Sequence, residues 1–132
     1  MTSTHRRVPG PMVTEEFASF WAAANAQRLQ LRRCRDTGKA YYPPRERSPF
    51  TGSLDTEAFD ACGSGTLYSF SVLLRTETPY CLAYVTLDEG PLILSNIQAT
   101  DFGTLRIGQR LRVVFVESTT GQKVPMFTPE WA

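Results

Sequence analysis

The sequence predicts a mainly β protein in which one short α-helix and a small ribbon-like hairpin precede a β-barrel. After residue 53, apolar and polar side chains alternate between glycine-containing turns, which is typical of short antiparallel strands. Residues 32–53 hold two short turns that each end in glycine, joined through tyrosines and prolines. Ahead of them, residues 15–27 carry apolar side chains at helical spacing.

We divide the 132 residues into a flexible lead at 1–13, a helix and ribbon at 14–53, and a barrel at 54–132. Pro9-Gly10-Pro11 opposes regular structure in the lead. The length suits one domain with a modest core. No apolar run approaches the ~20 residues that span a bilayer, and no apolar segment follows the first arginines as in a signal peptide. We therefore expect a cytoplasmic protein with no membrane contact.

The predicted helix begins after Thr14, a residue type that caps helix N-termini, and Glu15 and Glu16 suit the positive end of its dipole. Four apolar side chains recur at helical spacing and form one stripe: Phe17, Phe20, Trp21 and Ala24. The stripe must be covered by the protein's own barrel or ribbon, or by a partner's surface. Sequence alone favours internal packing.

The two ribbon turns each present two positions where a zinc ribbon carries a metal ligand, and these positions hold Cys34, Thr37, Ser48 and Thr51. Tetrahedral zinc takes four sulfur or nitrogen donors, and alcohols near neutral pH bind it poorly. Cys34 is the one ligand-type residue among the four. We therefore expect a metal-free ribbon and no cofactor. The aromatic side chains that we expect to hold the ribbon instead are Tyr41, Tyr42 and Phe50.

The ribbon strands are expected at 28–32 and 40–42, with Leu29 and Leu31 pointing to one side. The barrel is expected to follow with strands at 57–62, 66–75, 80–87, 91–97, 111–117 and 123–127. Pro125 cannot donate a backbone hydrogen bond, so the last of these strands should lie at a sheet edge.

The sequence holds no recognisable catalytic set. Its one histidine, His5, lies in the lead, so no barrel histidine can act as a general base or a metal ligand. Nucleotide-binding glycine motifs, nucleophile elbows and zinc-protease motifs are absent. Cys62 and Cys81 have no nearby base in the sequence and are best interpreted as core thiols. We therefore expect no catalytic residue and no independent enzyme.

Charge is distributed unevenly along the chain. Residues 28–47 contain seven basic and two acidic residues, whereas residues 48–132 contain five basic and nine acidic residues. A basic segment can be an ordinary solvated face, a site for an anionic ligand, or part of a nucleic-acid surface. The mildly acidic barrel and the sequence pI of 7.7 argue against nucleic acid.

Taken together, these motifs resemble a family of bacterial and archaeal OB-fold proteins with an N-terminal rubredoxin-like zinc ribbon, long catalogued as a domain of unknown function. The resemblance covers residues 17–129. It depends on the order and spacing of Phe20-Trp21, Arg33-Cys34, Gly38, Pro43-Pro44, Ser48-Pro49, residues 65–70, Pro79-Tyr80, residues 94–97, Ile107-Gly108 and residues 111–113. This chain departs from the family in lacking the other zinc cysteines.

The resemblance implies a non-catalytic partner subunit of a thiolase-like or synthase-like enzyme that acts on acyl-CoA thioesters. Such a subunit would stabilise its partner and help to form the acyl-CoA channel at a shared site. The candidate partner-binding residues are Phe17, Phe20 and Trp21. The candidate acyl-CoA-binding residues are Arg32, Arg33, Arg35, Lys39, Tyr41, Tyr42 and Phe50. The alternatives are a single-stranded nucleic-acid binder and a zinc module whose missing ligands come from outside the chain.

Overall fold

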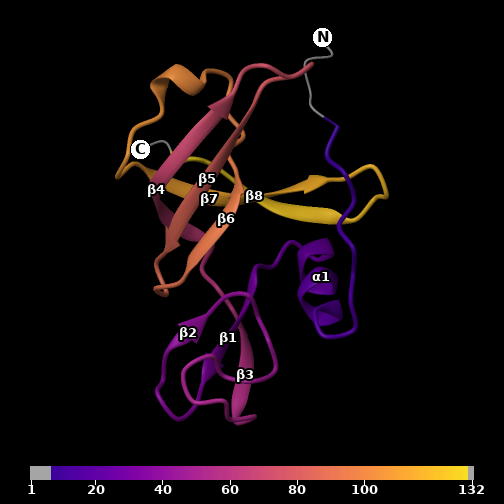
Figure 1. The fold of residues 1–132 in the computed structure, drawn as a ribbon, viewed down its shortest axis with the longest axis vertical. Coiled ribbons are helices and arrows are strands. Elements are labelled where there is room, and N and C mark those ends of the chain that lie inside the picture. Colours follow the sequence, from indigo (N-terminus) through magenta and orange to yellow (C-terminus); the bar gives the residue numbers. More distant parts are fainter. Residues whose placement is uncertain (1–6, 131–132) are drawn as a thin grey trace.

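A computed structural model describes residues 7–130, which form two antiparallel sheets with one α-helix beside them (Figure 1). The ribbon sheet has the order β2-β1-β3, with β1 at Gln30–Cys34, β2 at Ala40–Tyr41 and β3 at Thr56–Asp60. The barrel sheet has the order β6-β5-β4-β7-β8. Its strands are β4 Ser64–Leu73, β5 Tyr80–Leu87, β6 Leu92–Asn96, β7 Arg110–Glu117 and β8 Lys123–Pro129.

The five-stranded sheet curls until its two end strands meet, which gives the OB-fold barrel. A parallel bridge joins Ile97, just after β6, to Phe127 of β8, and the Ser95 hydroxyl donates to the Pro125 carbonyl at 2.9 Å. Pro125 lies opposite Phe115 on an end strand of the sheet, which confirms the predicted edge position. A 3₁₀-helix, η1 at Phe102–Thr104, lies in the loop between β6 and β7.

The core lies inside this barrel and extends under the helix. Its fully buried side chains alternate along the strands, as the pleat of a β-strand requires. They include Leu67, Val85, Leu87, Ile93, Leu111 and Phe127. Leu29 and Leu31 are also buried, at 2% and 0% exposure, and belong to the same cluster. The ribbon and the barrel therefore share one core.

The strand predicted at 57–62 belongs to a different sheet from the one we expected. It is β3, and it pairs with β1 of the ribbon from Gln30–Asp60 to Cys34–Thr56. The ribbon sheet therefore extends to residue 60, past the predicted boundary at 53. The barrel begins at β4, after a bend at Gly63 (φ +88°). Period-2 alternation reveals a strand but not its partner, so this pairing could not be predicted from the sequence.

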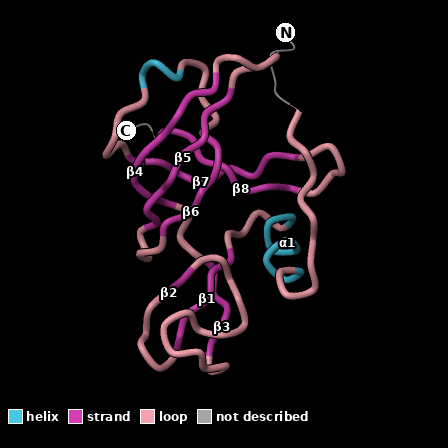
Figure 2. Tube along the Cα trace, in the orientation of Figure 1, coloured by secondary structure: helices cyan, strands magenta, loops and turns pink. Residues whose placement is uncertain are grey.

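The helix α1 spans Ala18–Asn25, which is shorter than the predicted range 15–27. Phe17 occupies the N-cap without a side-chain hydrogen bond, so the expected cap at Thr14 is wrong. Residues 15–17 form a turn ahead of the helix. The helix packs against β1 and β8, and the Asn25 side chain accepts a hydrogen bond from the Lys123 backbone at 2.9 Å. Figure 2 shows α1 lying beside the β7–β8 hairpin.

Of the predicted flexible lead, residues 1–6, including His5, lie outside the described residues. Residues 7–13 run along the β7–β8 turn, where the Val8 carbonyl accepts from the Thr119 backbone at 2.8 Å and the Val8 side chain is buried. Among residues 7–130, no helix is both long and apolar enough to cross a membrane.

Candidate functional site

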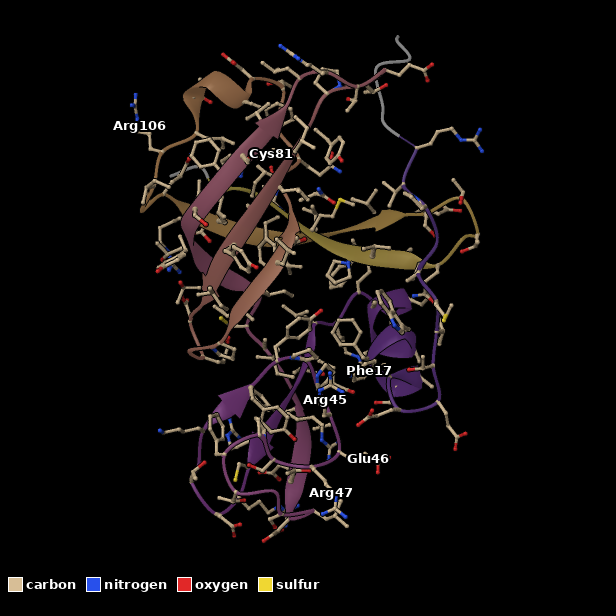
Figure 3. All side chains as sticks on the ribbon, viewed as in Figure 1. Phe17, Arg45, Glu46, Arg47, Cys81 and Arg106 are labelled. Carbon is tan, nitrogen blue, oxygen red and sulfur yellow. The ribbon has the colours of Figure 1, made fainter. Side chains whose placement is uncertain are left out.

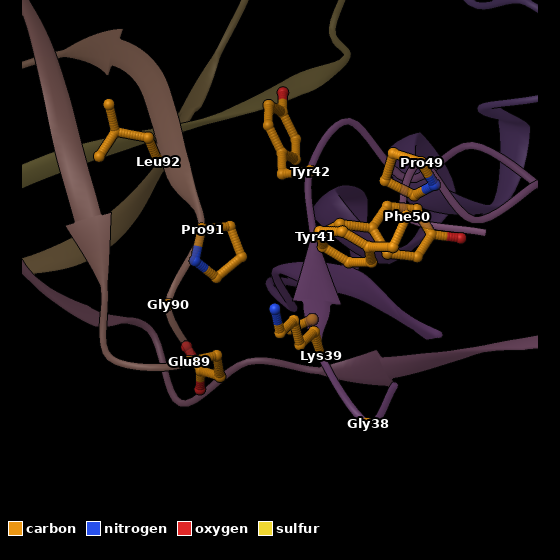
Figure 4. A pocket seen from close by; sticks show the side chains of 11 residues that line it. Gly38, Lys39, Tyr41, Tyr42, Pro49, Phe50, Glu89, Gly90, Pro91 and Leu92 are labelled. Carbon is orange, nitrogen blue, oxygen red and sulfur yellow. The ribbon is translucent and has the colours of Figure 1, made fainter. Parts of the chain in front are cut away.

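A groove of about 650 Å³ lies between the ribbon and the barrel. The ribbon contributes residues 38–42 with Pro49 and Phe50, and the barrel contributes residues 89–92 from the turn between β5 and β6. Figure 4 shows the tyrosines and Phe50 on the ribbon side, facing Pro91 and Leu92 across the opening. The groove is therefore built where two separate sheets meet.

Packing of aromatic rings orders the ribbon side of the groove. Tyr41 and Phe50 form an edge-to-face pair with centroids 6.1 Å apart, and the Tyr41 hydroxyl donates to the Arg45 carbonyl at 2.6 Å. The ring centroids of Tyr42 and Phe20 of the helix lie 5.8 Å apart. Burial raises the pKa of Tyr42. Tyr41 and Phe50 thus pack on each other within the ribbon, whereas Tyr42 packs on the helix, and Phe50 stays 47% exposed at the groove.

The barrel side of the groove is anchored by polar contacts behind it. Asp88 accepts two hydrogen bonds of 2.8 Å from Arg110 of β7, and these bonds hold the pKa of Asp88 below its usual range. The neighbouring Glu89 accepts from the Cys62 backbone at 2.8 Å through Oε2. Gly90, at φ +115°, completes the turn with a backbone conformation that favours glycine. The turn is thus fixed from two sides.

The groove holds one cation and one unsatisfied oxygen. Lys39 is exposed, lies 5.5 Å from the centre of the Phe50 ring and forms no ion pair within residues 7–130. Among residues 7–130, Glu89 Oε1 has no hydrogen-bond partner, and it has almost no accessible surface. A buried acceptor without a donor costs free energy, so this oxygen destabilises the turn slightly and is not open to a ligand in the groove.

The predicted arginines do not join the groove. Arg33 stacks over the Phe59 ring, and its Nη1 lies 3.8 Å from Glu57 Oε2. Arg35 Nη2 lies 3.3 Å from Glu57 Oε1. Arg32 donates to Thr56 at 2.8 Å. All three side chains thus contact β3, where Arg33 and Arg35 share the carboxylate of Glu57. Of the seven acyl-CoA candidates, the structure brings together Lys39, Tyr41, Tyr42 and Phe50.

The two ribbon turns bring the four expected ligand positions together. Cys34 is fully buried, and its sulfur lies 3.9 Å from the Thr51 hydroxyl oxygen. Ser48, 3% exposed, accepts hydrogen bonds from the Phe50 and Thr51 backbones at 3.0 and 3.2 Å. Hydrogen bonds from the hydroxyls of Ser48 and Thr37, and more weakly Thr51, lower the pKa of Cys34 to about 7 against the opposing effect of burial.

This cluster does not fit structural zinc, because three of its four side chains are alcohols. Within the described residues, no three histidine, cysteine, aspartate or glutamate side chains are arranged to hold a metal ion. Between the turns, the Cys34 thiol interacts with the hydroxyl groups of Ser48, Thr37 and Thr51. The turns themselves are closed by backbone bonds from Gly38 to the Cys34 carbonyl at 2.7 Å and from Gly52 to the Ser48 carbonyl at 2.9 Å.

The helical stripe lies largely inside the protein. Phe20 is 4% exposed and packs in the shared core. Its ring packs edge-to-face with that of Trp21, with centroids 5.0 Å apart. Phe17 and Trp21 are partly buried against the same core. Figure 3 shows Phe17 beside the ribbon loop, where Arg45 lies 5.9 Å from its ring. Of the three partner-binding candidates, Phe20 is thus occupied by internal packing.

The barrel exposes an apolar face that sequence analysis missed. Its large exposed side chains are Tyr68 of β4, Leu82 and Tyr84 of β5, and Leu92 and Leu94 of β6. The signal was present in residues 80–87, where both alternating sets are mostly apolar, although one face of a solvated strand is normally polar. We call this set the outer barrel face.

The remaining cysteines are poorly suited to catalysis. Burial raises the pKa of the Cys81 thiol in the core. Cys62 is exposed, so its interpretation as a core thiol is wrong. A backbone hydrogen bond at Ser64 favours the Cys62 thiolate, but desolvation and the carboxylates of Glu89 and Asp88 outweigh it, so the pKa of Cys62 is also raised. A thiol protonated at neutral pH is a weak nucleophile.

Comparison with known proteins matches both parts of the structure. Residues 21–48 match the family description "ChsH2, rubredoxin-like zinc ribbon domain", and residues 59–116 match "ChsH2, C-terminal OB-fold domain". A chain of the solved structure titled "Ltp2-ChsH2(DUF35) aldolase" superposes with a TM-score of 0.79 at 28% identity, over 91% of this chain and 98% of that chain. A DUF35-family structure from Sulfolobus solfataricus, with TM-score 0.66 and 9% identity, shares the fold.

Curated relatives carry two kinds of name. The chain is 29% identical to a "Probable enoyl-CoA hydratase alpha subunit" of Thermomonospora curvata, over 92% of this chain but 40% of that protein. It is 27% identical to a "DUF35 domain-containing scaffold protein" of Methanothermobacter thermautotrophicus, over 79% of this chain and 84% of that protein. Ribbon and barrel are matched together and in the same order, so the chain belongs to the ChsH2 (DUF35) family of rubredoxin-like zinc ribbons joined to OB-fold domains.

Proposed function

We propose that this chain is a non-catalytic subunit that binds a thiolase-like acyltransferase or aldolase and helps to form the channel for its acyl-CoA substrate. The observation that carries the proposal is the match of the whole ribbon-and-barrel unit to a chain that makes up part of a named aldolase complex. The hydratase alpha subunit is matched over 40% of its length, so its remaining part has no counterpart in this chain.

The groove supplies a chemically reasonable wall for an acyl-CoA. Tyr41, Tyr42 and Phe50 offer flat apolar surfaces, and Lys39, which has no ion-pair partner in the described part of the chain, offers a positive charge for a phosphate. In this proposal the partner supplies the catalytic nucleophile and base.

The test is reconstitution with the thiolase-like protein from the same organism. The pair should turn over a β-ketoacyl-CoA or β-hydroxyacyl-CoA, and this chain alone should not. Lys39→Ala combined with Phe50→Ala should raise KM about tenfold, the equivalent of ~1.4 kcal/mol of lost binding. Arg35→Ala is the matched control, because Arg35 is exposed but pairs with Glu57 away from the groove. Turnover by this chain alone would contradict the non-catalytic role.

The charge pattern argues against the nucleic-acid alternative. OB-folds bind oligonucleotides on the face of their second and third strands, which are β5 and β6 here. Residues 80–87 and 92–96 contain no lysine or arginine to pair with phosphates. Binding to single-stranded DNA that weakens steeply with salt would favour that alternative instead.

A further inference from the structure

The outer barrel face has a regular construction that the strand register makes explicit. Tyr84 lies opposite Leu94 of β6 on one side and Ser69 of β4 on the other. The adjoining rows are Ser71, Leu82 and Asn96, and Thr66, Thr86 and Leu92. Inward neighbours such as Val85 and Ile93 are buried at 0% and 1% exposure, so these rows form the outer surface.

None of the residues in these three rows carries a charge, and Tyr68, at the β4 bulge beside them, is also uncharged and 60% exposed. Leu82, Tyr84, Leu92 and Leu94 are 37%, 44%, 40% and 53% exposed. Exposed apolar side chains that stand together, with aromatic residues and without charge, mark the centre of protein–protein interfaces. On β7 the row of Thr66 continues to Arg110, whose charge is paired with Asp88 at 2.8 Å. The outward residues of β5 and β6 include no lysine or arginine, so this part of the face does not suit an anionic ligand such as nucleic acid or a phospholipid surface.

The face is continuous with the groove. Leu92 belongs to the outer barrel face and also lines the groove, and Pro91 precedes it in the turn. A body seated on β5 and β6 would therefore reach the edge of the groove and cover its barrel side. The groove is open to solvent between the two sheets, so a second wall at this edge would turn it into an enclosed channel.

We propose that the outer barrel face is the surface on which the catalytic subunit docks, through an apolar patch of its own that is also poor in charge, and that docking closes the groove. The inference rests on the proposed function, because it takes the thiolase-like enzyme as the occupant. An uncharged face discriminates against charged surfaces through the cost of desolvating an unpaired charge, so the partner's patch should match it in polarity.

The test compares two identical substitutions at leucines of similar exposure. Leu94→Asp places a carboxylate in the outer barrel face, and Leu54→Asp places one in the ribbon loop, where Leu54 is 60% exposed and lies outside the face and the groove. The affinity of each full-length variant for the purified thiolase-like protein is measured by calorimetry. We expect Leu94→Asp to weaken binding by about 30-fold or more, as at an interface hot spot, and Leu54→Asp to have less than about a threefold effect.

Tyr84→Ser is a milder second variant should Leu94→Asp fail to fold, and it should also weaken binding. Tight wild-type binding that neither face variant weakens would overturn the docking surface while leaving the proposed function intact. Absence of binding by the folded wild-type chain would overturn both. Self-association of the wild-type chain, abolished by Leu94→Asp and unaffected by the thiolase-like protein, would assign the face to a second copy and overturn the proposal.

Discussion

Tyr84 and Leu94 lie directly opposite each other on β5 and β6, and both project outward from a barrel whose inward positions are fully packed. Large apolar side chains at paired, exposed positions stabilise little in the isolated chain. The sheet therefore has an uncharged apolar surface that the monomer does not bury. For this reason we place the partner on the face around this pair and not on the helical stripe.

The register of β6 predicts opposite effects at adjacent positions. Ile93 is 1% exposed and Leu94 is 53% exposed. Leu94→Asp should change the free energy of unfolding by less than about 1 kcal/mol, whereas Ile93→Asp should cost roughly 3 kcal/mol or more, because it buries an unpaired charge. Urea denaturation of both variants checks this prediction. Equal destabilisation would mean that Leu94 is packed and that the outer barrel face is not a free surface.

Phe20 should matter for stability more than for partner binding. It is 4% exposed and contacts both Trp21 and Tyr42, so Phe20→Ala should lower the free energy of unfolding by about 3 kcal/mol. Partner affinity should stay within a few-fold of wild type at temperatures where the variant is folded. Ser19→Ala, at an exposed position of the same helix, serves as the control. Loss of binding with unchanged stability would place the stripe at the interface instead.

Cys34 should titrate near neutrality, well below the other two thiols. Its pKa is lowered to about 7 from 9.0, so the thiolate is favoured in the folded state. The resulting stability is fully present above pH 9.0 and is lost as the pH falls through about 7, so unfolding free energy should rise with pH across that interval. Thiolate absorbance in a Cys62→Ser background, with Cys34→Ala as the blank, measures the titration.

A Cys34 titration midpoint at or above 9.0 would contradict the hydroxyl network around the sulfur. Ser48→Ala gives a sharper check, because Ser48 makes the largest contribution to the lowered pKa of Cys34. This substitution should move the midpoint upward. Ser53→Ala should leave it unchanged, because the Ser53 hydroxyl accepts from the Asp55 backbone and only the Ser53 backbone contacts Ser48 and Thr51.

Metal binding should be absent until ligands are restored. The purified chain should contain far less than one zinc per molecule, and a chelator should not change its melting temperature, because three of the four ligand positions are alcohols. Substituting Thr37, Ser48 and Thr51 together by cysteine should create a tetrathiolate site that binds one Co²⁺ with intense thiolate charge-transfer absorption. Stoichiometric zinc in the wild-type chain, lost in Cys34→Ser, would favour ligands supplied from outside the chain.

Local patterns in the sequence predicted the five strands of the barrel sheet, although they wrongly added residues 57–62 to it. Alternation predicted β5 with the bounds that the structure shows, and Pro125 predicted an edge strand. The aromatic residues at 41, 42 and 50 were expected to hold the ribbon, and Tyr41 packs on Phe50 while Tyr42 packs on Phe20 of the helix. These successes depend on side-chain periodicity and on proline's missing donor, which are local properties of the chain.

Long-range pairing accounts for what the sequence did not reveal. The arginines at 32, 33 and 35 looked free because their partners on β3 lie more than twenty positions away. The barrel side of the groove, with Glu89 and Pro91, is remote in sequence from the ribbon that it faces. Predicting the outer barrel face requires the sheet order, in which β6 is an end strand that pairs with β5. The sequence alone does not supply this order, because apolar residues in a strand are equally consistent with burial on both faces.

The most direct measurement of the central claim is co-purification of the tagged full-length chain from its native host, with mass spectrometry of the recovered proteins and native mass determination of the complex. The account predicts a thiolase-like protein at near-stoichiometric yield, and its loss when the tagged chain carries Leu94→Asp but not Leu54→Asp. Recovery of the wild-type chain alone, or with nucleic acid that dissociates in salt, would contradict it.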